Sequence, residues 1–127
     1  MRQCYKIVNL DKMQYIDPND FNEGEKLLEF SCNIRGTLTA LSLLLSDGCG
    51  RGGGDLYTDK TVVGSWAGDR IVVTGDYADK GKFTSVKDRN VYQLIQKGAF
   101  LNISKLIIDA MKDDGCLKQR LEINGIK

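Results

Sequence analysis

The most constraining feature of this 127-residue chain is the segment SDGCGRGGGD at positions 46–55, which holds five of the fourteen glycines between Gly48 and Gly54. Each ordered glycine loses more backbone entropy on folding than alanine would, about 0.5 to 1 kcal/mol. A left-handed backbone, the close approach of another part of the chain, or a ligand on bare amides can offset that cost. This segment is therefore the first candidate for a functional loop.

The same glycine loop predicts an anion-binding cradle. Consecutive amides of Gly52, Gly53 and Gly54 form a concave nest, and Arg51 adds a forked cation, so phosphate is the natural ligand. The loop lacks the GKS or GKT ending of a P-loop and the spacing of a dinucleotide-binding fold, and Asp55 stands where a phosphate site needs a cation. The alternative interpretation is a glycine-rich hairpin or crossing point where another backbone packs closely.

Length, charge and cysteine content narrow the function classes. With 42% hydrophobic and 28% charged residues, the chain is expected to form one domain over residues 1–127. The formal net charge of +1 produces no long-range field for nucleic acid, and no apolar run is long enough to span a membrane. The four cysteines lack metal-binding or redox spacing, and no signal-like segment opens the chain. These features predict a cytoplasmic protein whose reduced thiols are buried as small hydrophobes, with Cys49 in the glycine loop as the exception.

Alternating and β-branched residues predict three strands, at 5–8, 61–63 and 70–77. The last of these is the strongest prediction, and Gly75 within it indicates a bulge or a close backbone approach. Strands at the start and middle of the chain, with helices between and after them, predict an α+β fold. We expect a small mixed sheet with two or three helices packed on it.

Apolar residues spaced three and four apart predict a buried helix over 38–45 and a second helix over 103–111. Ser46, Asp47 and Gly48 are expected to end the first helix, with Gly48 in the left-handed conformation after the last turn. Asn102 is expected to cap the second helix and Gly115 to end it. Three segments stay ambiguous. Segment 21–34 is only weakly predicted as a short helix, 90–100 fits either a helix or a strand, and 116–127 fits a short helix or a frayed end.

The only tryptophan, Trp66, lies between Gly64 and Gly68. Its ring is able to stack on a base or sugar, with Tyr57 and Tyr77 as companions, or to fill the core while the glycines fold over it. The sequence alone leaves both interpretations open.

Acidic residues crowd the glycine-rich middle of the chain: Asp47, Asp55, Asp59, Asp69, Asp76 and Asp79. Carboxylates on loops at strand ends suit magnesium or calcium, but this spacing matches no calcium motif, and aspartate beside glycine commonly forms turns. The chain has no histidine and no nucleophile elbow, so an enzyme is disfavoured.

Several motifs lie between residues 5 and 80: YKIVNLDK, YIDP, KLLEF, GTLTAL, GRGGGD and VGSWAGDRIVVTGDYAD. In these motifs the chain resembles an uncharacterised family of small bacterial and phage-borne proteins. The resemblance implies a bacterial or prophage origin in the cytosol, and it carries no activity.

The leading prediction is non-catalytic binding of a small anionic ligand, such as a nucleotide, with no cofactor. The glycine loop and the segment GSWAGDR are expected to face one another. Arg51 and Arg70 would neutralise charge, and Trp66 or Tyr77 would stack. The remaining residues of this predicted ligand site are Gly52, Gly53, Gly54, Asp55, Asp69 and Asp76.

Two other function classes stay open. The first is a protein-interaction module, such as an inhibitor or immunity protein of a mobile element, whose glycine loop packs at an interface. The second and weaker one is a metal-dependent enzyme that acts on phosphate esters through Asp55, Asp69 and Asp76. A homo-oligomer fits either binding hypothesis, because small domains often complete a site at a symmetric interface.

Overall fold

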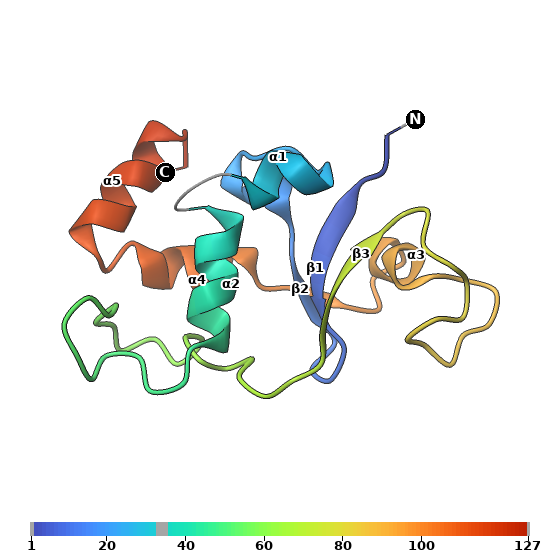
Figure 1. Cartoon of the computed structure of the whole chain (residues 1–127), viewed down its shortest axis with the longest axis horizontal. Coiled ribbons are helices and arrows are strands. Elements are labelled where there is room, and N and C mark those ends of the chain that lie inside the picture. The colour runs from blue at the N-terminus through green and yellow to red at the C-terminus, as the bar shows by residue number, and fades with distance from the viewer. Residues whose placement is uncertain (1, 33–35, 127) are drawn as a thin grey trace.

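The computed structural model describes residues 2–32 and 36–126 of the chain (Figure 1). Its elements, in chain order, are strands β1 (Tyr5–Asn9) and β2 (Gln14–Ile16), the 3-10 helix η1 (Pro18–Phe21), helices α1 (Leu27–Ser31) and α2 (Thr37–Leu45), strand β3 (Ile71–Gly75), helix α3 (Val91–Gln96), strand β4 (Leu101–Asn102), and helices α4 (Ser104–Met111) and α5 (Gly115–Ile123). This arrangement confirms the predicted α+β fold with a small mixed sheet.

The sheet has four strands in the order β3-β1-β2-β4. Strand β1 is antiparallel to both of its neighbours, whereas β2 and β4 are parallel. The predicted strands at 5–8 and 70–77 form the longest pairing, which runs from Tyr5 opposite Gly75 to Asn9 opposite Ile71. Strand β3 therefore ends the sheet on one side, and the two-residue β4 ends it on the other.

Each face of the sheet carries its own apolar cluster, because successive side chains of a strand point to opposite faces. Ile7 belongs to the larger cluster, which includes side chains of α2 and α4 together with Trp66. Val8 belongs to the smaller cluster, with Val91 and Ile95 of α3. Figure 1 shows α2 and α4 on one side of the sheet and α3 on the other.

The buried helix predicted over 38–45 is confirmed as α2, but Gly48 is not part of its cap. The helix ends at Leu45, where the backbone amide and the hydroxyl of Ser46 both donate to the carbonyl of Leu43. Gly48 does have a left-handed backbone, with φ of 80°. It lies beyond the helix end, however, and belongs to the loop that follows.

The second predicted helix is confirmed as α4, and the oxygen of the Asn102 side chain accepts from the amide of Ser104 at 2.9 Å. The prediction that Gly115 ends this helix is wrong, because α4 ends at Met111 and Gly115 begins α5. Asp114 caps the new helix by accepting from the amide of Leu117 at 2.9 Å.

The three ambiguous segments each contain a helix. Segment 90–100 contains α3, which is capped by reciprocal bonds between Asn90 and Gln93. Segment 21–34 contains α1, and residues 33–35 lie outside the described residues. Residues 116–123 of the tail lie in α5, whose Leu121 is fully buried in the larger cluster, and residue 127 lies outside the described residues.

Two further predictions are wrong. Residues 61–63 form turns rather than a strand. The three cysteines expected to be buried are not: Cys4 is partly exposed, and Cys32 and Cys116 are exposed. Cys49, the expected exception, is partly exposed.

Candidate functional site

The glycine loop does form a nest of backbone amides, and the chain's own carboxylate occupies it. One oxygen of Asp55 accepts from the amides of Gly50, Arg51 and Gly52 at 2.9, 3.0 and 3.1 Å. The bond from Gly50, then those from Gly52 and Arg51, lower the pKa of Asp55 below its usual value. Asp55 therefore supplies the anion that this cradle was predicted to take from a ligand.

The tip of the loop is contacted by Tyr57, whose hydroxyl donates to the carbonyl of Gly52 at 2.7 Å, but space remains around the three glycines. A Cβ atom added at Gly52, Gly53 or Gly54 would have no neighbour within 4 Å. Among these three glycines, only Gly54 has a left-handed backbone, with φ of 90°. The amides of Gly53 and Gly54 and the guanidinium of Arg51 have no hydrogen-bond partner among the described residues, so they are the donors that the loop leaves open.

Close backbone packing occurs at Gly64 rather than in the loop. A Cβ there would lie 2.7 Å from the carbonyl oxygen of Ser46, and the backbone is left-handed with φ of 80°. The amide of Gly64 donates to Leu43 and the amide of Trp66 donates to Leu44, each at 2.9 Å. The segment that contains GSW therefore bonds two carbonyls in the last turn of α2: that of Leu44, and that of Leu43, which also accepts from Ser46.

Trp66 is a core residue, with an exposed fraction of 0%. Its indole nitrogen donates to the side-chain oxygen of Gln14 at 2.8 Å, which satisfies the polar end of the ring. The core interpretation is therefore confirmed. A ring in this position has no free face on which a ligand can stack.

Asp69 and Arg70 are bound to the turn that joins β1 to β2. Asp69 accepts from the side-chain amide of Asn9 at 2.8 Å and pairs with Lys12. Arg70 donates to Asp11 from its backbone amide and from its Nε atom, both at 2.8 Å. These bonds lower the pKa of Asp69, chiefly through Asn9, and that of Asp11, chiefly through Arg70. The motifs NLDK and GDR are thus complementary halves of one polar contact.

Asp76 and Tyr77 lie at the opposite end of β3 from Arg70. One carboxylate oxygen of Asp76 accepts from the amide of Cys4 at 3.0 Å, and the Asp76 amide donates back to the Cys4 carbonyl at the same distance. These bonds extend the β1–β3 pairing by one residue. Tyr77 is 54% exposed.

The predicted site residues therefore fall into separate groups. In the described part of the chain, no hydrogen bond or ion pair joins the loop at 51–55 to Asp69 or Arg70. Within the same described residues, no three carboxylates or thiols lie together in a way that would hold a metal ion. The expectation that the loop faces GSWAGDR as one ligand site gains no contact from this arrangement and stays a prediction.

A buried charge network lies on the α3 side of β1. The ammonium group of Lys6 lies 3.0 Å from Asp17, 3.5 Å from Glu25 and 5.0 Å from the ring centre of Tyr92. Burial by itself lowers the pKa of Lys6, but the hydrogen bond and charge of Asp17 outweigh it and raise the pKa to about 12. Lys6 is therefore permanently charged near neutral pH, and it ties the segment after β2 to the central strand rather than serving as a base.

The edge of β3 is a feature that the sequence analysis missed. The amide of Leu10 donates to the carbonyl of Arg70, and the amide of Asp76 donates to the carbonyl of Cys4. Because bonding residues alternate in an antiparallel pair, Val72 and Thr74 direct their backbone groups toward β1. The backbone groups of Ile71, Val73 and Gly75 therefore point away from the sheet.

Along this edge lies a groove of about 350 Å³, here called the β3 groove. Its lining includes Val73, Tyr77, Lys82 and Phe83, and the last of these is 56% exposed. Phe83 has a left-handed backbone with φ of 62°, which is costly for a bulky side chain, and the ammonium group of Lys82 lies 5.4 Å from its ring centre. An exposed aromatic residue is thus held beside open backbone groups.

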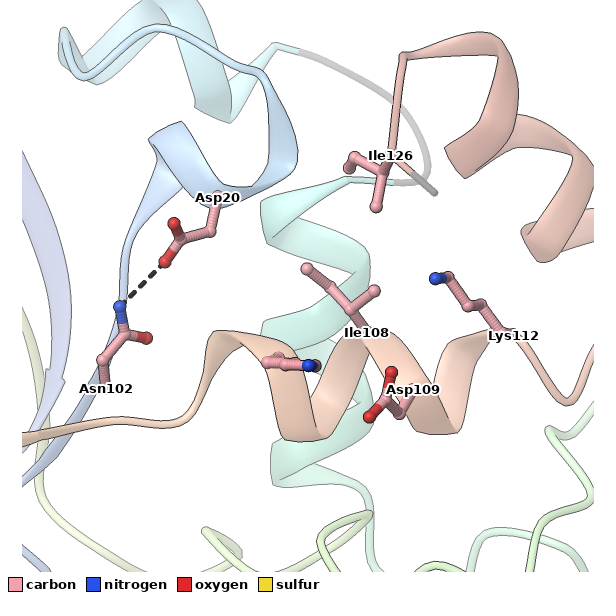
Figure 2. A pocket seen from close by; sticks show the side chains of 7 residues that line it. Asp20, Asn102, Ile108, Asp109, Lys112 and Ile126 are labelled. Atoms are coloured by element: carbon pink, nitrogen blue, oxygen red, sulfur yellow. Dashed lines mark hydrogen bonds between the residues drawn. The ribbon is translucent and has the colours of Figure 1, made fainter.

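A second pocket, of about 420 Å³, lies between η1, α4 and the C-terminal end of the described chain (Figure 2). Asp20 accepts from the side-chain amide of Asn102 at 2.8 Å on one side of it. Ile108 and Ile126 line it together with Lys112 and the acidic Asp109, as Figure 2 shows. Because acidic and basic groups mix around its rim, this pocket does not select one ligand charge.

None of the helices in the described residues is long and apolar enough to cross a membrane. The chain matches no protein family, no curated protein and no solved structure at a significant level. The resemblance to small bacterial and phage-borne proteins therefore stays a prediction.

Proposed function

We propose that the protein is a non-catalytic interaction module that binds an extended segment of polypeptide along β3. The observation that carries this proposal is the open edge of β3, where the backbone groups of Ile71 and Val73 have no partner among the described residues. Strand addition satisfies such groups directly, because main-chain hydrogen bonds provide affinity and adjacent pockets provide specificity.

The sequence of β3 supports this role. The strand reads IVVTG and contains no charged residue and no proline. Monomeric proteins commonly protect an edge strand with a charge, a proline or a bulge, because an unprotected edge pairs with other chains. Val73, at the centre of the strand, is 39% exposed, which is a high exposed fraction for an apolar β-branched side chain. The β3 groove adds the exposed rings of Tyr77 and Phe83 as apolar contacts.

The test is a binding comparison between three immobilised proteins and a library of linear peptides. The wild type is compared with Val73→Lys, which places a charge at the open edge, and with Leu106→Lys, a matched control at an exposed apolar position on α4. The proteins are immobilised sparsely, so that two copies do not meet. We expect peptides to bind the wild type and the control, and this binding to be lost with Val73→Lys. Equal binding by all three proteins, or chemical-shift changes in the bound wild type that avoid β3, would contradict the proposal.

A second candidate is anion binding at the tip of the glycine loop, in a narrower form than predicted. It is favoured by the donors of Arg51, Gly53 and Gly54, which are exposed and unpaired within the described chain. The carboxylate of Asp55 opposes it by its charge. Inorganic phosphate at millimolar concentration should raise the melting temperature of the wild type but not of Arg51→Ala; the same response from both proteins would remove this candidate.

A further inference from the structure

This inference rests on the proposed strand addition at β3 and identifies its partner. We infer that the segment that pairs with β3 is the same strand of a second copy of the chain, related by a two-fold axis at Val73. The two copies then form one continuous sheet of eight strands, because each contributes the four strands of its own sheet.

The backbone supports an antiparallel pairing centred on Val73. The outward-pointing residues are Ile71, Val73 and Gly75, which are spaced two apart around that centre. Ile71 and Val73 have open amides and carbonyls, whereas the carbonyl of Gly75 already accepts from the amide of Ala78 at 3.1 Å. In a two-fold arrangement Val73 bonds with Val73 of the second copy, and Ile71 lies opposite Gly75 of the second copy. A shift of two residues in either direction leaves part of the five-residue strand unpaired.

Charge at the two ends of the strand selects the same arrangement. Arg70 precedes β3 and Asp76 follows it, so antiparallel pairing about Val73 places each of these residues opposite the other in the second copy. Oppositely charged residues that face each other across a strand pair stabilise it, whereas like charges destabilise it. A parallel pairing would instead bring arginine to arginine and aspartate to aspartate.

The side chains of Arg70 and Asp76 each have polar atoms that are free to bond across this pairing. The side chain of Arg70 is 72% exposed and bonds Asp11 through its Nε atom, which leaves its terminal nitrogens available. Asp76 uses one carboxylate oxygen to accept from the amide of Cys4, and its other oxygen has no partner among the described residues.

The pairing also covers the exposed apolar groups at this edge. The two Val73 side chains lie beside each other at the axis and shield one another from water. Val72 of the second copy lies opposite Thr74, on the sheet face that carries α3, and therefore lies next to the β3 groove with Phe83. One partner thus satisfies the open backbone groups, the end charges and the exposed ring together.

The first test is the solution mass of the full chain by sedimentation. We expect the wild type to have twice the mass of the monomer, and Leu106→Lys to behave in the same way. Val73→Lys should have the monomer mass, because two lysines would meet at the axis. A wild-type monomer at all concentrations would overturn the inference, as would a dimer that persists in a folded Val73→Lys variant.

The second test needs no variant and uses amide hydrogen exchange in the wild type at several protein concentrations. The amides of Val72 and Thr74 bond β1 within one copy, so their protection should not depend on concentration. The amide of Val73 should become protected only as concentration rises. Fast exchange of Val73 at every concentration would overturn the inference.

The outcomes separate this inference from the proposed function. A monomer that still binds linear peptides at β3 overturns the second-copy pairing and leaves the interaction module standing. A monomer that binds no peptide overturns both. A dimer whose Val73 amide is protected supports both.

Discussion

The glycine loop at 46–55 and the edge of β3 form a contrast. The loop stands out in the sequence but is largely satisfied in the structure, whereas β3 is ordinary in the sequence but has an open edge in the structure. The loop has an unusual composition, yet Asp55 satisfies the three amides of its nest. Strand β3 has an ordinary composition, yet backbone groups of Ile71 and Val73 have no partner in the described chain. Backbone groups without hydrogen-bond partners are therefore a better indication of a binding surface than an unusual composition.

The largest expected effect tests a fully satisfied part of the molecule, the Lys6 network. Lys6→Met leaves the mostly buried carboxylates of Asp17 and Glu25 without their cation. Because an uncompensated buried charge is strongly unfavourable, the free energy of unfolding should fall by about 3 to 5 kcal/mol. Urea unfolding monitored by Trp66 fluorescence measures this, with Lys97→Met as the exposed control. Similar losses in both variants would show that the network does not stabilise the fold.

Two glycine-to-alanine substitutions test whether Gly64 is closely packed and the loop tip is not. Gly64→Ala forces a left-handed alanine against the Ser46 carbonyl, so the free energy of unfolding should fall by about 1 to 3 kcal/mol. Gly53→Ala meets no neighbour, and it should leave stability unchanged or raise it by up to about 1 kcal/mol. Thermal unfolding of the two variants measures the difference. A larger loss at Gly53 would mean that the loop tip is packed after all.

Alkaline pH gives a smaller effect through Lys6. The pKa of Lys6 is raised to about 12 in the folded protein, above the ordinary value of 10.5. The resulting stability is fully present below pH 10.5 and is lost as the pH rises through 12. Burial also raises the pKa of Tyr15 and Tyr92, which adds a loss of the same sign. Unfolding curves between pH 9 and 12 should therefore be less steep in pH for Lys6→Met than for the wild type; identical slopes would contradict the raised pKa of Lys6.

The smallest expected effect is a local change in the glycine loop when Asp55 loses its charge. Asp55→Asn removes the charge that fills the nest, so the amides of Gly50, Arg51 and Gly52 should exchange faster while global stability changes little. The lowered pKa of Asp55 predicts the same change in the wild type at acid pH. The contribution of the carboxylate is present above its unfolded pKa of 3.8 and is lost as the pH falls through the lower folded value. Unchanged amide exchange in both experiments would mean that the carboxylate does not order the loop.

Elements that depend on a local pattern of residues could be predicted from the sequence. The period of two in YKIV and RIVVTGDY and the spacing of leucines over 38–45 place β1, β3 and α2, because these patterns reflect the geometry of single elements. Asn102 likewise indicates the start of α4, because its side-chain oxygen accepts from the amide of Ser104 only two residues further on. Helix and strand could not be separated over 90–100, because short apolar runs fit both periods.

Which polar groups have hydrogen-bond partners depends instead on contacts between distant parts of the chain. The partners of Asp69, Arg70 and Asp76 lie about sixty to seventy positions away in the chain, and Trp66 meets Gln14 across a similar separation. Strand order, which makes β3 an edge, depends on the whole sheet. No local pattern records such pairings, because burial and hydrogen bonding depend on what the fold brings alongside each residue.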